Sequence, residues 1–145
     1  MQIDVTSDTF RLAQVFTISR GSRTEAQVLT VRISDGGVTG MGECVPYARY
    51  GETLESVTAQ IEGLSGALTR QGLYDLLPAG AARNAVDCAL WDLEAKQSGT
   101  PVWQLAGLDP LRPEITAYTL SLDTPENMRV QAAKNAFRPL LKIKL

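Results

Sequence analysis

"GAARNAVDCALWDLEAKQSG", residues 80–99, is the stretch that decides the fold, because its apolar residues follow one helical stripe. The stripe consists of Ala82, Val86, Ala89 and Leu93. Gly99, followed closely by Pro101, predicts where this helix ends. Small side chains let neighbouring backbones come close, so the many alanines predict a helix packed tightly against its neighbours.

The residues before this helix predict an antiparallel meander. Strand-like composition covers about 3–6, 10–19 and 26–34, and Asp35-Gly36-Gly37 is a hairpin signal. The returning strand, "VTGMGEC" at 38–44, contains two glycines that indicate a close backbone approach. Between the meander and the stripe, Thr53 predicts the start of a further helix, and a short piece follows at 73–77.

The pattern changes after residue 114. "ITAYTLSL" at 115–122 predicts a strand, about Pro125–Phe137 a helix, and "PLLKIKL" at 139–145 a second strand. The predicted buried face of this helix consists of Met128, Ala132, Ala133 and Ala136. Strand, helix and strand in this order form a βαβ unit with parallel strands. Such a unit needs further strands beside it, so we expect the sequence to be cut off there.

Composition limits the partners and the catalytic groups that we expect of this protein. The 145 residues carry a net charge of −2 with scattered cations, which predicts no nucleic-acid partner and no membrane partner. No apolar run reaches the roughly 18 residues that span a bilayer, and no export signal is visible, so we expect a cytoplasmic protein with free thiols. Histidine is absent. Any acid–base catalysis must therefore use the side chains of Lys, Glu, Asp, Tyr or Cys.

Lys142 and Lys144 are the first candidate site. Residues two apart on a strand share a face, about 7 Å from each other. A solvated edge strand would show the same pattern. If the face instead points into a sheet or barrel interior, mutual repulsion and lost hydration disfavour the charged ammonium, and one lysine can serve as a general base.

Two loops provide further candidates. Arg20 and Arg23 flank a Gly-Ser turn, where they are either solvated or able to clamp a carboxylate. "GECVPYARYGET" at 42–53 is either a structured connection or a lid carrying Tyr47 and Tyr50. The carboxylates are dispersed, and no local group of three predicts a metal site.

Together these stretches resemble the muconate-lactonizing-enzyme subgroup of the enolase superfamily. "SRGSRTEAQVLTVRI", "GECVPYARYGET", "LPAGAARNAVDCALWDL" and the closing "LKIKL" follow its order, and more narrowly look like bacterial L-Ala-D/L-Glu dipeptide epimerases. The resemblance implies an α+β capping domain, an antiparallel meander followed by helices, over 1–112. It further implies the first βαβ of a (β/α) barrel over 113–145, truncated after its second strand.

The resemblance also implies roles for individual residues. Lys144 would be the acid/base that exchanges the proton α to a carboxylate, and Lys142 would contact the substrate and keep Lys144 available as a base. Thr119 would contact the substrate, as would Tyr50 in the loop. A loop arginine would bind the carboxylate end of a dipeptide. Gapless placement from the following strand selects Arg20, with Arg23 as the alternative.

The remaining parts of such an enzyme are expected outside these residues. The family uses Mg²⁺ and a second lysine, and their positions lie beyond residue 145, so we expect no metal ligand here and no activity from these residues alone. The resemblance implies a small-molecule dipeptide as partner and a homo-oligomer. A cycloisomerase, an N-acylamino-acid racemase, an o-succinylbenzoate synthase or an inert binding module remain alternatives.

Overall fold

The computed structural model describes residues 1–145 and divides into two compact units. Unit 1 comprises Met1–Thr9 and Gln27–Pro110, and unit 2 comprises Phe10–Ala26 and Leu111–Leu145. The two units are interleaved along the sequence, because the tip of a long N-terminal hairpin groups with the C-terminal residues. A contiguous domain boundary at residue 112 stays a prediction.

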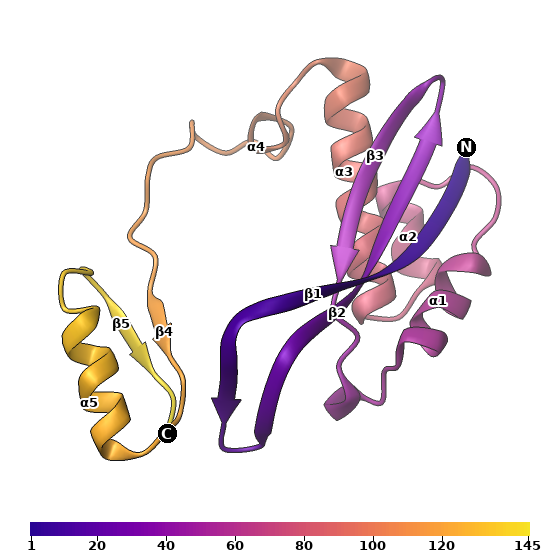
Figure 1. Ribbon diagram of the computed structural model, residues 1–145. Helices are drawn as coiled ribbons and strands as arrows, with labels where there is room; N and C mark the ends of the chain where they lie inside the picture. Colours follow the sequence, from indigo (N-terminus) through magenta and orange to yellow (C-terminus); the bar gives the residue numbers. More distant parts are fainter. The chain divides into compact units, whose positions relative to one another are not determined.

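The chain opens with the predicted antiparallel meander (Figure 1). Its strands are β1 (Gln2–Ile18), β2 (Gly21–Asp35) and β3 (Val38–Cys44), in the order β1-β2-β3. β2 and β3 turn at Gly36 and Gly37, whose positive φ angles of 57° and 82° favour glycine. The two strand segments predicted in the first 19 residues are one continuous strand. The Thr30 hydroxyl donates to Asp8 at 2.9 Å, within the stretch where a break was expected.

Helices complete unit 1. They are the short 3₁₀ helix η1 (Ala48–Tyr50), α1 (Leu54–Glu62), α2 (Arg70–Leu76), α3 (Ala81–Ser98) and α4 (Val102–Leu105). Thr53 caps α1 as predicted, because its hydroxyl accepts the Ser56 N–H at 3.1 Å, and the Ser56 hydroxyl accepts the Thr53 N–H in return. None of the helices combines the length and the apolar character that crossing a bilayer requires.

The core of unit 1 lies between one face of β2 and the helices. β2 contributes alternate residues to it, as expected for a strand with one buried face. The largest fully buried side chains are Leu29, Val31, Ile33, Val57, Ile61, Leu73 and Val86. α3 supplies most of the small residues of this core, which its alanine-rich sequence predicts.

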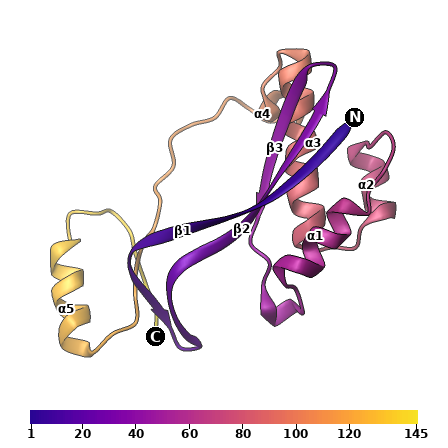
Figure 2. The same ribbon diagram turned by 45° about the vertical axis from the view of Figure 1, so that its right-hand side comes forward.

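The closest packing in unit 1 joins α3 to β3, which lie side by side in both views (Figures 1 and 2). A Cβ atom added to Gly40 would overlap the carbonyl oxygen of Ala89, and one added to Gly42 would overlap that of Ala85. The glycines on the strand and the alanines on the helix therefore let two backbones touch. This confirms the close approach that the glycines of β3 indicate.

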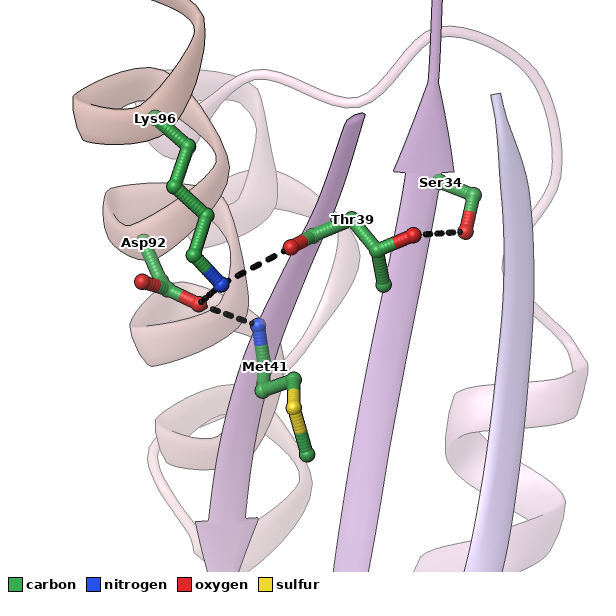
Figure 3. A network of polar contacts seen from close by, with 5 residues as sticks. All are labelled: Ser34, Thr39, Met41, Asp92 and Lys96. Carbon is green, nitrogen blue, oxygen red and sulfur yellow. Dashed lines mark hydrogen bonds and ion pairs between the residues drawn. The ribbon is translucent and has the colours of Figure 1, made fainter. Parts of the chain in front are cut away.

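Polar contacts lock α3 against β3 along the same line (Figure 3). The Asp92 carboxylate accepts the Met41 N–H at 2.7 Å and the Lys96 ammonium at 2.6 Å. Lys96 also donates to the carbonyl of Thr39 at 2.9 Å. Burial opposes ionisation of Asp92, but the hydrogen bonds from Lys96 and Met41 outweigh it and hold the pKa of this carboxyl below its usual value.

Trp91 anchors α3 on its other side. The guanidinium of Arg70 on α2 lies 3.4 Å from the centre of the Trp91 ring and donates to Glu94 at 2.9 Å. Trp91, Asp92 and Glu94 thus all serve to hold α3 against its neighbours.

Unit 2 contains β4 (Tyr118–Leu120), α5 (Pro125–Lys134) and β5 (Leu141–Ile143), with β4 and β5 parallel. The strand–helix–strand order is as predicted, but each element is shorter. α5 ends at Lys134, not near Phe137. The prediction that Ala133 and Ala136 are buried is wrong: both are exposed, because two short strands are too narrow to cover the whole face of the helix.

Replacing Gly42 by alanine is expected to destabilise the protein by about 3 kcal/mol, because the added methyl group meets helix backbone that cannot move aside. Urea denaturation measures the free energy of unfolding. Gly63→Ala is the matched control: Gly63 has φ −71° and ψ −12°, and its added Cβ would come no closer than 3.3 Å to its neighbours. Equal stabilities of the two variants would contradict the close contact.

Replacing Asp92 by asparagine is expected to cost about 1 kcal/mol near pH 7, because the ionised carboxylate holds both Met41 and Lys96. The pKa of Asp92 is lowered by folding, so its contribution is present above the ordinary aspartate value of 3.8 and is lost as the pH falls through the folded value. Urea denaturation should therefore show the gap between wild type and variant closing as the pH falls below the ordinary aspartate value. Asp75→Asn, on the exposed side of α2, should show no such gap.

Candidate active site

The parallel pair β4–β5 places the predicted lysines and threonine on one face. Thr119 pairs with Lys142 in the ladder, and paired residues of neighbouring strands point to the same side. The Lys144 N–H donates to the carbonyl of Leu120 at 3.2 Å, which continues the ladder past the end of β5. Alternation therefore brings Lys144, and with it Ser121, to the same face as Lys142 and Thr119.

The burial of this face differs between the two lysines. Lys144 is half-buried, whereas Lys142 is exposed. The expectation that both are shielded from water is therefore not met at Lys142, because β5 has a neighbouring strand on one side only. Ile143 and Leu145, which belong to the opposite face, are exposed for the same reason.

The opposite face of β4 is held by the segment that follows α5. The Arg138 guanidinium lies 4.0 Å from the centre of the Tyr118 ring and donates to the side-chain oxygen of Asn135 at 3.0 Å. Asn135 is buried and donates to the carbonyl of Gln131 at 2.9 Å. These contacts fix β4 against α5 and leave the face with Thr119 clear of the helix.

The arginine-bearing hairpin belongs to the same compact unit. Arg20 lies in the turn between β1 and β2, is exposed and has no ion-pair or hydrogen-bond partner, and Arg23 lies on β2. Just before the turn, the Thr17 N–H donates to the Ser121 hydroxyl at 2.6 Å, and the Leu122 N–H donates to the Thr17 carbonyl at 2.9 Å. The base of the turn is thus bonded to the segment that follows β4.

Tyr50 belongs to unit 1, whereas the other predicted site residues belong to unit 2. It ends η1, is 76% exposed, and its ring centre lies 5.6 Å from that of Tyr47. The loop is anchored by Glu52, whose carboxylate accepts the Tyr47 N–H at 3.0 Å and the Ala81 N–H at 2.7 Å. The loop is therefore a structured connection, with one aromatic ring left at the surface.

The acidic residues present do not fit a magnesium site. No group of three or more His, Cys, Asp or Glu side chains could hold a metal ion. Asp123, in unit 2, instead accepts hydrogen bonds from Asn127 and Thr124, which lower its pKa. These residues therefore supply no ligand set for a metal ion.

The cysteines do not provide a nucleophile either. Both thiols are free, as the sequence predicts. Burial, followed by the negative charges of Glu52 and Glu43, raises the pKa of Cys44 to about 11, so it is protonated at neutral pH. Burial and Asp87 also raise the pKa of Cys88. Both cysteines belong to unit 1, whereas unit 2 contains the face of β4–β5 that carries Thr119, Ser121, Lys142 and Lys144, here called the lysine face.

Two residues that hold candidate site segments in place were not predicted from the sequence. They are Ser121 in unit 2 and Glu52 in unit 1. Ser121 could have been found, because the alternation in "TLSL" places it on the face of Thr119. Glu52 had no signal in the sequence: it caps α3 from 29 residues away, where the N-cap residue itself, Gly80, has no side chain to do so.

Comparison with known proteins gives a consistent family. Residues 1–107 match the family described as "Mandelate racemase / muconate lactonizing enzyme, N-terminal domain". The chain is 44% identical to the L-Ala-D/L-Glu epimerase of Escherichia coli, covering 99% of this chain and 46% of that protein. It is also 44% identical to an N-acetyl-D-glutamate racemase of Pseudoalteromonas, covering 81% of this chain and 39% of that one.

Solved structures agree with the fold. An enolase family member from Agrobacterium tumefaciens, with homology to dipeptide epimerases and bound to sodium and L-Ala-L-Glu, superposes with a TM-score of 0.94 at 55% identity, over 98% of this chain and 45% of that one. A dipeptide epimerase from Methylococcus capsulatus, complexed with Mg and L-Arg-D-Lys, gives a TM-score of 0.86 at 29% identity, over 99% and 45%.

The chain spans about half the length of the relatives that it matches. Within that span, the meander, the helices and the first parallel strands all correspond to known members of one family. The chain therefore belongs to the mandelate racemase/muconate lactonizing enzyme family of the enolase superfamily.

Proposed function

We propose that residues 1–145 are the N-terminal part of a dipeptide epimerase that inverts the α-carbon of glutamate in L-Ala-D/L-Glu. The observation that carries the proposal is the shared face of Thr119, Lys142 and Lys144 on β4–β5, with the Arg20 hairpin bonded to the same strand end. A relative named for this activity, at 44% identity, supports the choice of substrate.

Lys144 is the proposed acid/base. Removing the proton next to a carboxylate builds up a second negative charge, so the base must act where positive charge is concentrated. Lys142 provides such charge two residues away on the same face. Lys144 must be uncharged to accept a proton, and it is the more buried of the two lysines. The resulting ammonium can return the proton to the same side of the carbon.

Inversion needs a second base on the opposite side of the α-carbon. These residues supply one acid/base only, so the second is proposed to come from outside them, as are the ligands of the magnesium on which the enzyme is proposed to depend. Relatives complexed with Mg support the choice of ion. The contribution of this chain is then one proton transfer and part of substrate binding.

The remaining site residues are proposed to bind the substrate. The Arg20 guanidinium can pair bidentately with a carboxylate of the dipeptide, because it is exposed and has no partner of its own. Arg23 is the alternative. Thr119 offers a hydroxyl on the lysine face, and Tyr50 offers an exposed ring at the end of η1. We further propose a cytoplasmic homo-oligomer that acts in the recycling of cell-wall peptides.

A racemase of N-acylated glutamate is the second candidate, favoured by the 44% identity to an N-acetyl-D-glutamate racemase. Both substrates present an N-acylated glutamate to Lys144 and Arg20, and they differ in the acyl group, where alanine adds a free amino group and a methyl group to the acetyl. Measuring kcat/KM of the full-length protein for L-Ala-L-Glu and for N-acetyl-glutamate separates them. Preference for the acetylated compound would reject the dipeptide.

Replacing Lys144 by alanine in the full-length protein is expected to reduce epimerisation by at least about a thousandfold, because one of the two proton transfers is lost. In D₂O, α-proton exchange should persist for only one of the two epimers, since the second base still serves its own side. Proton NMR of L-Ala-L-Glu and L-Ala-D-Glu measures both. Lys134→Ala, on the exposed side of α5, is the control. Exchange of both epimers in the Lys144 variant would contradict the assignment.

Replacing Arg20 by alanine is expected to raise KM for L-Ala-D-Glu by about thirtyfold, because a charge-assisted hydrogen-bond pair is lost. Arg23→Ala is the matched comparison from the same hairpin, with a smaller expected effect. Steady-state kinetics on the full-length protein distinguishes them. A larger effect at Arg23 would exchange the two roles, and an unchanged KM in both variants would show that neither arginine binds the substrate carboxylate.

A further inference from the structure

Ser121 occupies an unusual position in unit 2, because its side chain takes part in the hydrogen bonds that connect Thr17 of β1 to residues 121–122. This contact is called the joint below. β1 pairs with β2 on one side, and the N–H and carbonyl of Thr17 meet the segment after β4. The carbonyl of Thr17 accepts a backbone N–H, from Leu122 at 2.9 Å. The N–H of Thr17 has no backbone carbonyl there, and the Ser121 hydroxyl accepts it at 2.6 Å. The same hydroxyl lies 3.2 Å from the Thr17 carbonyl.

This joint stands between the two halves of the proposed site. Arg20 lies three residues after Thr17, in the turn of the hairpin. Ser121 follows Leu120, whose carbonyl accepts the Lys144 N–H at 3.2 Å. Arg20 is therefore connected to Lys144 by stretches of backbone and by the hydrogen bonds between Thr17 and residues 121–122. Across the hairpin, the Thr17 and Ser22 hydroxyls lie 2.8 Å apart, which ties both strands to the joint.

Packing does not replace these hydrogen bonds. A cavity of about 540 Å³ lies beside the joint, and Thr17, Ser121 and Leu122 are among its lining residues. Where side chains do not fill the space, directional hydrogen bonds are left to set the position of the hairpin. An alanine at 121 would keep the strand alternation but leave the Thr17 N–H without its acceptor.

We propose that Ser121 is a positioning residue that sets the carboxylate-binding turn of Arg20 relative to Lys144. The inference rests on the proposed function for its consequence in catalysis, whereas the joint itself is independent of it. Ser121 acts through Thr17 and is not in the proton transfer. Its loss should therefore weaken substrate binding and leave the chemical step unchanged.

The test is Ser121→Ala in the full-length protein, with two readouts. Hydrogen–deuterium exchange of a peptide covering residues 10–26 should become about fivefold faster, while a peptide from α3 is unchanged. KM for L-Ala-D-Glu should rise about fivefold at constant kcat. Ser121→Thr keeps the hydroxyl and should restore both values. Ser34→Ala removes a serine hydroxyl that lies 2.8 Å from that of Thr39 in unit 1, and serves as matched control.

A double-mutant comparison of Ser121→Ala with Arg20→Ala tests whether Ser121 acts by positioning Arg20. In an Arg20→Ala background, adding Ser121→Ala should leave KM unchanged, because the group that Ser121 positions is gone. Additive effects would overturn the proposal, as would faster exchange with an unaltered KM in an active enzyme. Unchanged hydrogen–deuterium exchange of the peptide covering residues 10–26 would show that Ser121 does not hold the hairpin, and would overturn the proposal. Faster exchange in a wild-type-like fold without any epimerase activity would instead reject the proposed function and leave the joint standing. If the alanine variant does not fold, Ser121→Cys provides a weaker acceptor of closer volume for the same measurements.

Discussion

The parallel pairing of β4 with β5 is the constraint on which the candidate site depends. Alternation along each strand sends every second side chain to the same side, and the pairing of Thr119 with Lys142 aligns the two strands. A shift of one residue in either strand would turn its polar side chains toward α5 and its apolar ones away. The lysine face thus follows from backbone hydrogen bonds rather than from any attraction between its side chains.

Unit 1 is built on a different constraint, the direct contact of two backbones. Gly40 and Gly42 place no side chain of β3 toward α3, so the strand backbone reaches the carbonyl oxygens of Ala89 and Ala85 on the helix. The polar groups along this line, Asp92 above all, then satisfy each other at short distance. The same unit carries the exposed Tyr50 loop, which Glu52 anchors through the N–H groups of Tyr47 and Ala81.

Several predictions from the sequence were right because they depend on neighbours along the chain. The hairpin turn at Gly36-Gly37 needs two residues with positive φ, and the cap of α1 needs a hydroxyl three residues before an N–H. The extent of α5 was wrong because a helical stripe continues past Lys134 in the sequence, while the two short strands cover only part of that face. Local pattern cannot report how wide a surface the rest of the fold offers.

The sequence by itself determined the order of the elements, a close backbone approach at the glycines of β3, and the placement of Lys142 and Lys144 on one strand face. These follow from side-chain size and from the periods of helix and strand. Only the tertiary structure decided that Ser121 meets Thr17, 104 residues away, and that Glu52 caps α3. The reason is that a hydrogen bond between distant residues depends on the path of the chain, and no spacing in the sequence records that path.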